Sequence, residues 1–207
     1  PFQSKEVEEE FYLQLNLLGK SKAYAKAMRN IKKVARNNSP VFVRGESGTG
    51  KELVARAIHY ISDRRGQPFV PINCGAFTDE LILSELFGHQ RGAFTGASTD
   101  RVGLLETANG GTLFLDEVDA LSPKAQVSLL RYLQEGEIRP IGSNKVKNVE
   151  VRVISATNKD TKELVEKDLL RQDLMYRLDI LNVTMPPLRR RGEDIQLLAQ
   201  YYLAQLA

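Results

Sequence analysis

The feature that most constrains this chain is a glycine-rich run near its start. The run fits the first seven places of the pattern G-x-x-x-x-G-K-[ST], a phosphate-binding loop between a strand and a helix, and it has Glu at the eighth place. Its positions are Gly45, Glu46, Ser47, Gly48, Thr49, Gly50, Lys51 and Glu52. Residues 41–43 predict a short buried strand before the loop, and the spacing of Val54, Ile58 and Ile61 predicts a helix after it. The sequence therefore predicts strand, loop and helix in direct succession.

Such a loop turns its backbone N–H groups toward phosphates, and the start of the following helix adds a partial positive charge. Lys51 would bind the β- and γ-phosphates of a nucleotide. Glu52 stands where Ser or Thr would place a hydroxyl on Mg²⁺, so we expect the metal to find other ligands. The alternative is a glycine turn followed by an exposed lysine.

Composition narrows the class of protein. The chain has 207 residues, of which 42% are hydrophobic, enough for one domain with a sizeable core. A net charge of +3 is too small to indicate nucleic-acid binding by itself. The single cysteine, Cys74, excludes an internal disulfide and favours a reducing compartment, which we expect to be the cytoplasm. No apolar run is long enough to span a bilayer. The start at Pro1 resembles no signal peptide and lacks Met, so we expect a piece of a longer protein.

Apolar runs alternate with helical patterns along the chain. We expect strands at 41–43, 69–73, 112–117, 151–158 and 180–185, and helices at 22–36, 78–86, 123–135 and 161–178. A hairpin over 137–151 would turn at 142–145. This alternation predicts an α/β fold with a parallel sheet and helices on both faces.

The two ends carry further helical patterns. Residues 4–18 place Val7, Phe11, Leu15 and Leu18 on one face, which indicates either a linker helix packed on the domain or a dimer seam. Residues 193–207 have one broad apolar stripe, typical of an amphipathic helix. We expect that helix to begin a second, helical subdomain.

Polar residues follow several of the expected strands. Asp116 and Glu117 close one strand, Asn158 closes another, and Asn73 ends a third. Ligands of parallel sheets bind outside the carboxyl ends of the strands, where Gly45 also lies. Asp116 suits Mg²⁺ and Glu117 suits a water molecule, although adjacent strand residues point to opposite sides unless the strand has already ended.

Asn158 would sense the γ-phosphate or the water, and Asn73 could hold Glu117 away from the water. The alternative for Asp116 and Glu117 is a pair of exposed carboxylates. His59 and His89 are isolated, the second in a polar loop, and no His/Cys cluster has zinc spacing.

Three motifs together resemble the central AAA+ domain of bacterial sigma-54-dependent transcription activators, also called enhancer-binding proteins. They are residues 45–52, the run Gly92, Ala93, Phe94, Thr95, Gly96 and Ala97, and residues 110–117. Residues 73–74, 85–88 and 171–191 match the same family, and the resemblance covers about residues 17–207.

The resemblance implies a P-loop AAA+ domain with a parallel five-stranded sheet and helices on both faces, followed by the start of a small helical lid. It divides the chain into a linker helix (1–16), an ATPase subdomain (17–187) and the beginning of the lid (188–207). It also implies a homo-oligomeric ring of six or seven subunits with ATP and Mg²⁺ between neighbours. Arg171 and Arg177 match the arginine fingers of the family, and residues 92–97 match the loop tip that binds sigma-54 RNA polymerase.

The residues themselves agree in kind but leave alternatives. Arg171 and Arg177 would share one face of a helix too polar to be core, although they could be solvated surface arginines. Phe94 between glycines indicates an exposed contact residue, although it could be tucked against the domain. The hairpin over 137–151 resembles a second pore loop that moves with the first.

Two departures from the family accompany these matches. Asp119 replaces the usual Gly just after the catalytic pair, and the later part of the lid, with its own arginine, is absent. The DNA-binding domain is absent too, so we expect DNA binding only through a separate domain. The implied function is ATP turnover coupled to remodelling of the sigma-54 closed complex. The alternatives are another AAA+ remodeller, which Phe94 and Thr95 argue against, and a scaffold that binds ATP without turnover.

Overall fold

Five parallel strands form the central sheet of the computed structural model, which describes residues 11–206. Their spatial order is β2 (Phe69–Asn73), β5 (Thr112–Asp116), β8 (Arg152–Thr157), β1 (Val41–Arg44) and β9 (Leu181–Thr184). Chain order and spatial order differ because each crossover passes over a face of the sheet, as parallel strands require. The predicted five-stranded parallel sheet is confirmed, with strand ends within two residues of the expected ones.

Helices connect and cover these strands. They are α2 (Lys22–Ala35), α3 (Lys51–Ile61), α4 (Asp79–Phe87), α5 (Leu104–Thr107), α6 (Pro123–Glu135), α7 (Thr161–Glu166), α8 (Gln172–Leu178) and α9 (Gly192–Leu206), with short 3₁₀ turns η1 (Cys74–Ala76), η2 (Val118–Ala120) and η3 (Leu188–Arg190). Local chemistry sets several boundaries. The Ser122 side chain accepts a hydrogen bond from the N–H of Ala125 and Pro123 opens α6, as the sequence predicts.

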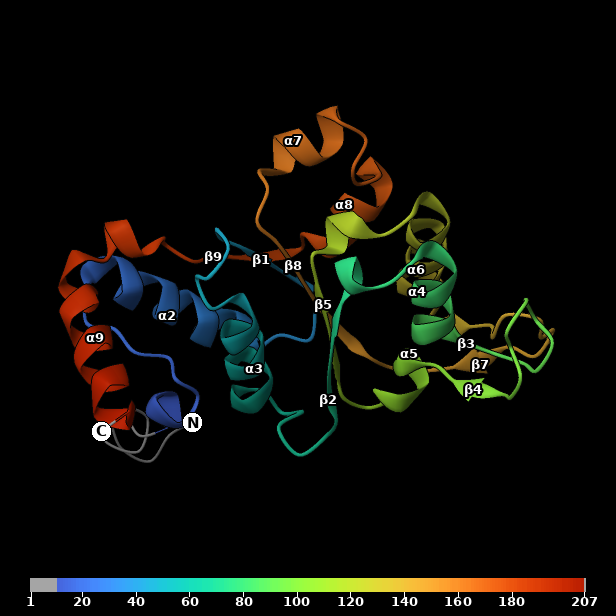
Figure 1. Ribbon diagram of the computed structural model, residues 1–207, viewed down its shortest axis with the longest axis horizontal. Helices are drawn as coiled ribbons and strands as arrows, with labels where there is room; N and C mark the ends of the chain where they lie inside the picture. The colour runs from blue at the N-terminus through green and yellow to red at the C-terminus, as the bar shows by residue number, and fades with distance from the viewer. Residues whose placement is uncertain (1–10, 207) are drawn as a thin grey trace.

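The two faces of the sheet bury different sets of side chains. Leu113 and Leu115 of β5 pack with α4, α5 and α6, whereas Phe114 between them packs with α2 and α3. In Figure 1 these two groups of helices lie on opposite sides of the strands. Each of the three side chains is at most 1% exposed, which stabilises the fold by roughly 1.5–3 kcal/mol per side chain.

Two short antiparallel ribbons lie beyond the sheet. β3 (Gly88–His89) pairs with β4 (Arg101–Val102), and β6 (Glu137–Ile138) pairs with β7 (Lys147–Asn148). The predicted hairpin is therefore present, with short strands. Figure 1 shows β3, β4 and β7 at the opposite end of the molecule from α9.

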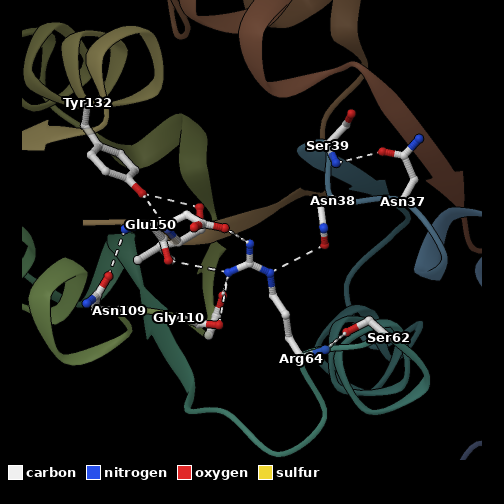
Figure 2. Close-up of polar contacts among 11 residues, drawn as sticks. Asn37, Asn38, Ser39, Ser62, Arg64, Asn109, Gly110, Tyr132 and Glu150 are labelled. Atoms are coloured by element: carbon white, nitrogen blue, oxygen red, sulfur yellow. Dashed lines mark hydrogen bonds and ion pairs between the residues drawn. The ribbon is translucent and has the colours of Figure 1, made fainter. Parts of the chain in front are cut away.

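Arg64, which follows α3, ties together the segments that enter the sheet. Its Nη1 donates to the carbonyl oxygen of Gly110 at 3.0 Å and its Nη2 pairs with Glu150 Oε1 at 2.5 Å. These two segments precede β5 and β8 (Figure 2). The Tyr132 hydroxyl of α6 accepts a hydrogen bond from the N–H of Val151 at 3.1 Å. This network holds the amino ends of the strands, away from their carboxyl ends.

One expectation about the helices was wrong. Residues 161–178 form two helices because Leu164, Leu170 and Leu174 are all buried, and the chain turns back between them through Asp168 with φ +52°. In α6 the buried positions are Ala125, Gln126, Leu129, Leu130 and Tyr132, and the half-buried Leu133 packs against the same core.

The ends of the chain are described in part. Residues 11–14 are helical, and Phe11 and Leu15 pack against the cluster of α2 and α3, while Val7 lies outside the described residues. In α9 the expected apolar stripe is exposed, with Leu203 at 66% and Leu206 at 86%. The division at residues 16 and 187 stays a prediction. No helix within residues 11–206 is both long and apolar enough to cross a membrane.

Candidate nucleotide site

The carboxyl ends of four neighbouring strands converge at one edge of the sheet. Arg44 of β1 lies in register with Thr157 of β8, and Asn73 of β2 lies in register with Asp116 of β5. The segments that follow these strand ends therefore lie side by side, and they hold the glycine loop, Asn158, Glu117 and η1. The structure brings together the groups that the sequence placed at separate strand ends.

The glycine loop is open, and no side chain caps the start of α3 that follows it. Gly48 and Gly50 take φ values of +78° and +85°, which favour glycine. Gly50 precedes α3 and offers no side chain to the first N–H groups of that helix, and no atom lies within 4 Å of where a Cβ on Gly48 would stand. Lys51 Nζ donates back to the carbonyl oxygens of Gly45 at 3.1 Å and Glu46 at 3.3 Å. This arrangement of free amides, open space and one amine fits a chain of phosphates.

The two glutamates of the loop point elsewhere. Glu46 accepts two hydrogen bonds from Arg189 of η3, at 2.6 and 2.5 Å, and this partner lowers the pKa of the Glu46 carboxyl. Glu52 accepts from Arg56 one turn later on α3, at 2.8 and 3.0 Å. Glu46 thus connects the loop to the segment before α9, and the Glu52 carboxylate is engaged along the helix surface.

The strand that carries the paired carboxylates ends at Asp116. Glu117 adopts a left-handed conformation with φ 52° and ψ 47°, and its N–H donates to Asp116 Oδ1 at 3.0 Å. Because the strand has ended, the two side chains are free of the alternation that would separate them. Both can serve the same site.

The Glu117 carboxylate lies over Gly75. A Cβ on Gly75 would collide with Glu117 Oε2 and would also stand 3.3 Å from Asn73 Oδ1. Asn73 Oδ1 accepts the N–H of Gly75 at 2.8 Å and so begins η1. Within residues 11–206, no hydrogen bond joins the side chains of Asn73 and Glu117, although they are close together.

The donor set fits Mg²⁺ held jointly with a nucleotide. No group of three or more His, Cys, Asp or Glu side chains that could hold a metal exists among the described residues. Mg²⁺ usually takes only one or two carboxylates together with substrate phosphates and waters. Asp116, at the carboxyl end of β5, would be the carboxylate for that role.

Asn158 is flanked by a contact that sequence reasoning missed. Thr157 Oγ1 donates to Asp119 Oδ1 at 2.6 Å, and Lys159 Nζ pairs with Asp119 Oδ2 at 2.9 Å. The sequence marked Asp119 only as a departure from a family pattern. Its partners lie about forty residues away in sequence, so no local signal could have found them.

Arg171 and Arg177 were expected to share one face of a polar helix, but only Arg177 lies within a helix. Arg171 is the residue before α8, and its guanidinium binds Asp173 at 2.8 and 3.0 Å. Arg177 lies in the last turn of α8, is exposed, and has no hydrogen bond or ion pair within residues 11–206. Leu174 and Leu178 of the same helix are buried in the core.

The tip at residues 92–97 is compact, and its Phe94 side chain is partly buried. Gly92 and Gly96 have φ values of +79° and +99°, and the N–H of Gly92 donates to Ala97 O at 2.8 Å. Thr95 is exposed, but Phe94 is only half-buried rather than free, because its ring meets the His89 ring edge-on with centroids 5.0 Å apart.

His89 was expected in a polar loop but is buried. Its Nδ1 lies 2.6 Å from Ser84 Oγ of α4. The second loop, between β6 and β7, is joined to the first loop, between β3 and β4. The N–H of Gln90 donates to Ile141 O and the N–H of Ile141 donates to Gly88 O, each at 2.9 Å.

The remaining candidates are structural. Cys74 is buried, and burial raises the pKa of its thiol to about 12. His59 is fully buried with its Nδ1 2.9 Å from Thr112 Oγ1. Both side chains lie in the packed interior of the domain.

Known proteins resemble this chain over most of its length. The profile of the family described as "Sigma-54 interaction domain" matches residues 17–184. The Nif-specific regulatory protein of Azotobacter vinelandii is 48% identical over 202 residues, which are 98% of this chain and 39% of that protein. The transcriptional regulatory protein ZraR of Klebsiella oxytoca is 50% identical over 94% of this chain and 44% of its own length. The chain thus spans about two fifths of these relatives.

Solved structures agree with this result. NtrX from Brucella abortus in complex with ATP has a TM-score of 0.86 and 37% identity, covering 98% of this chain and 46% of that one. The P-loop NTPase domain of a sigma-54 transport activator from E. coli has a TM-score of 0.56 and 22% identity over 83% of this chain, a likeness of fold alone. The five-stranded sheet with its helices is therefore a P-loop AAA+ fold, as predicted.

Proposed function

Because the chain belongs to the family of sigma-54 interaction domains, we propose that it couples ATP hydrolysis to remodelling of the closed complex of sigma-54 RNA polymerase. The outcome of that remodelling is an open promoter and active transcription. Support comes from the match over residues 17–184 and from a relative that binds ATP in its crystal structure. In this proposal the domain works in the cytoplasm as part of a longer activator, and DNA sequence is read by another domain.

The residues at the sheet edge take separate roles in hydrolysis. The first N–H groups of α3 and Lys51 bind the phosphates of ATP. Asp116 would hold Mg²⁺, whose charge would favour phosphoryl transfer when it is bound. Glu117 orients the attacking water and accepts its proton, and Asn158 hydrogen-bonds the γ-phosphate or that water. In this proposal Asn73, whose Oδ1 accepts the N–H of Gly75 beside the Glu117 carboxylate, would hold Glu117 away from the water before the site is complete.

A second copy of the chain completes the site. The exposed guanidinium of Arg177 has no partner within residues 11–206, so it is free to reach the γ-phosphate bound by a neighbour. Arg171 acts with it once released from Asp173. The assembly in this proposal is a ring of six or seven subunits with ATP at each interface.

The compact tip at residues 92–97 provides the contact with sigma-54. Thr95 offers an exposed hydroxyl, and Phe94 offers an aromatic ring when it leaves His89. The two hydrogen bonds between the loops make residues 139–146 move with this tip. Sigma-54 is bound when the nucleotide state favours the released conformation, as differential affinity requires.

One observation carries the proposal: the glycine loop, Asp116, Glu117 and Asn158 converge at one edge of the sheet in a chain that also presents the glycine-flanked Phe94–Thr95 tip. The test is co-migration with sigma-54 on a native gel in the presence of ADP and aluminium fluoride. Phe94→Ala and Thr95→Ala should each lose sigma-54 binding and retain ATPase activity. Phe94 should matter more, because a buried aromatic anchor typically contributes about 2–4 kcal/mol at an interface.

The matched control for this test is Thr99→Ala, an exposed threonine in the same loop but outside the tip. It should bind sigma-54 as the wild type does. Undiminished co-migration of Phe94→Ala would remove the sigma-54 assignment and leave a generic AAA+ ATPase.

A further inference from the structure

One buried carboxylate, that of Asp119, links the turn after Glu117 to the segment that holds Asn158. Asp119 Oδ1 accepts a hydrogen bond from Thr157 Oγ1 at 2.6 Å, and its Oδ2 pairs with Lys159 Nζ at 2.9 Å. Thr157 and Lys159 are the residues immediately before and after Asn158. A single side chain therefore binds both neighbours of the proposed γ-phosphate sensor.

The environment of Asp119 makes this a firm contact. Its side chain is 7% exposed, whereas that of Lys159 is 38% exposed. Burial raises the pKa of the Asp119 carboxyl, but the hydrogen bonds from Lys159 and Thr157 outweigh burial and leave the pKa below its usual value. The carboxylate is thus charged and doubly bound at neutral pH, unlike the exposed pairs that contribute little to stability.

The other end of the link is the backbone that carries Glu117. Asp119 lies in η2, which begins directly after Glu117, and the N–H of Ala120 donates to the Glu117 carbonyl oxygen at 2.8 Å. Val118 in the same turn is fully buried. Because this turn is hydrogen-bonded at Glu117 and packed at Val118, a change at Asp119 would reach Glu117 as well as Asn158.

We propose that Asp119 is a positioning residue that holds Glu117 and Asn158 in one fixed arrangement for ATP hydrolysis. It acts through Thr157 and Lys159 and contacts neither nucleotide nor metal itself. Glu117 and Asn158 come from different strands, so their relative position depends on a link between β5 and β8 beyond the sheet. The inference rests on the proposed ATPase function.

The test compares Asp119→Asn and Asp119→Ala with the control Glu163→Gln. The control removes the exposed ion pair between Glu163 of α7 and Lys167, in which Nζ and Oε1 are 2.8 Å apart. The readouts are kcat and KM for ATP, affinity for ADP, and amide hydrogen exchange at residues 157–160. Rates are compared at a protein concentration at which the wild-type activity per subunit no longer rises.

We expect kcat of Asp119→Ala to fall about ten- to a hundredfold with KM and ADP affinity within about threefold of wild type, since a misplacement of about 1 Å can cost a hundredfold in rate. Asp119→Asn should lower kcat in the same direction, and hydrogen exchange at 157–160 should increase in both variants. Lys159→Met should also lower kcat, and combining it with Asp119→Ala should add little, because both remove one link.

Two results would overturn the proposal. The first is a kcat for Asp119→Ala equal to that of Glu163→Gln, with unchanged exchange at 157–160. The second is a loss of kcat that simply follows a lower unfolding midpoint or a smaller assembled fraction, which would show a general structural role. If the wild type itself hydrolyses no ATP, the proposed function fails instead, and the exchange at 157–160 alone then decides whether Asp119 holds the Asn158 segment.

Discussion

At the scale of single residues, the backbone at Glu117 explains how two adjacent carboxylates can serve one site. In a continuing strand the two side chains would point to opposite faces of the sheet. The strand instead ends at Asp116, and the left-handed conformation of Glu117 turns its carboxylate over Gly75 toward the end of β2. A side chain at position 75 would force that carboxylate to move.

The first prediction at this scale concerns Glu117→Gln. The variant keeps the shape and the hydrogen-bonding reach of the side chain but loses its ability to accept a proton. It should bind ATP as the wild type does and lose about 10²–10⁴ in turnover, the usual contribution of a positioned base. Lys51→Ala is the matched comparison and should lose nucleotide binding itself.

Nucleotide binding is measured with a fluorescent ATP analogue and turnover by phosphate release. Wild-type turnover by Glu117→Gln would show that Glu117 has been given the wrong role. A chain that binds ATP without any turnover, in the wild type as in the variant, would instead support the scaffold alternative.

At the scale of elements, the buried Asp194 joins α9 to the start of α2. Its Oδ1 accepts the N–H of Ser21 at 2.8 Å, and its Oδ2 accepts from Ser21 Oγ at 2.7 Å and from Arg191 Nε at 2.9 Å. Arg191 in turn lies over the Tyr24 ring, 4.6 Å from its centroid. This network, rather than the exposed apolar stripe of α9, holds the last helix against the described part of the domain.

Asp194→Ala should therefore destabilise the fold by about 3–5 kcal/mol, because removing one partner leaves the buried Arg191 guanidinium uncompensated. The exposed neighbour Glu193→Ala is the control and should change stability by less than about 0.5 kcal/mol. Chemical denaturation followed by circular dichroism measures both. Equal midpoints for the two variants would contradict the role of this network.

The same network gives stability a definite dependence on pH. Burial raises the pKa of the Asp194 carboxyl, but the hydrogen bonds from Lys20, Arg191 and Ser21 together leave it below its usual value. A carboxyl with a lowered folded-state pKa contributes stability that is present above its unfolded pKa, about 3.9, and is lost as pH falls through the folded value. The difference in stability between wild type and Asp194→Ala should shrink only in that acid range.

Features encoded within short stretches could be predicted from the sequence, and features built by distant contacts could not. The glycine loop, the Asp116–Glu117 pair and the start of α6 at Ser122–Pro123 each depend on neighbouring residues, and the structure has them where they were expected. The break between α7 and α8 depends on burial of Leu164 and Leu170 against the domain. Burial of this kind overrides local helix propensity and has no local signature.

The same difference between local features and distant contacts applies to the candidate nucleotide site. Lys51 was predicted from the glycine-loop pattern and Asn158 from its position after an expected strand, and their roles stay predictions. The Asp119 contact with Thr157 joins residues far apart in sequence, as does the Glu46 contact with Arg189. The half-buried state of Phe94 depends on His89, which the sequence alone placed in a polar loop.

At the scale of the whole molecule, the candidate nucleotide site and the proposed sigma-54 contact lie in different parts of one chain. The ribbons that carry the two loops stand at the end of the molecule opposite α9 (Figure 1). Gly142 in the second loop, with φ +78°, leaves space that Ala93 of the first loop fills, so the loops form one unit. In the proposed function, α4, whose Ser84 contacts His89, is one route by which a change of nucleotide state would reach that unit.

The most direct test of a site shared between subunits is ATPase activity in mixtures of two inactive variants. Lys51→Ala should lack nucleotide binding, and Arg177→Ala should lose nearly all turnover, since an arginine finger contributes about 10³–10⁵ in related GTPases. Activity per subunit of the wild type should rise with protein concentration. Mixing the two variants should restore part of the activity, because a mixed ring contains some interfaces with both Lys51 and Arg177 intact. Flat activity per subunit on dilution, together with no recovery on mixing, would contradict a site completed by a second copy of this chain.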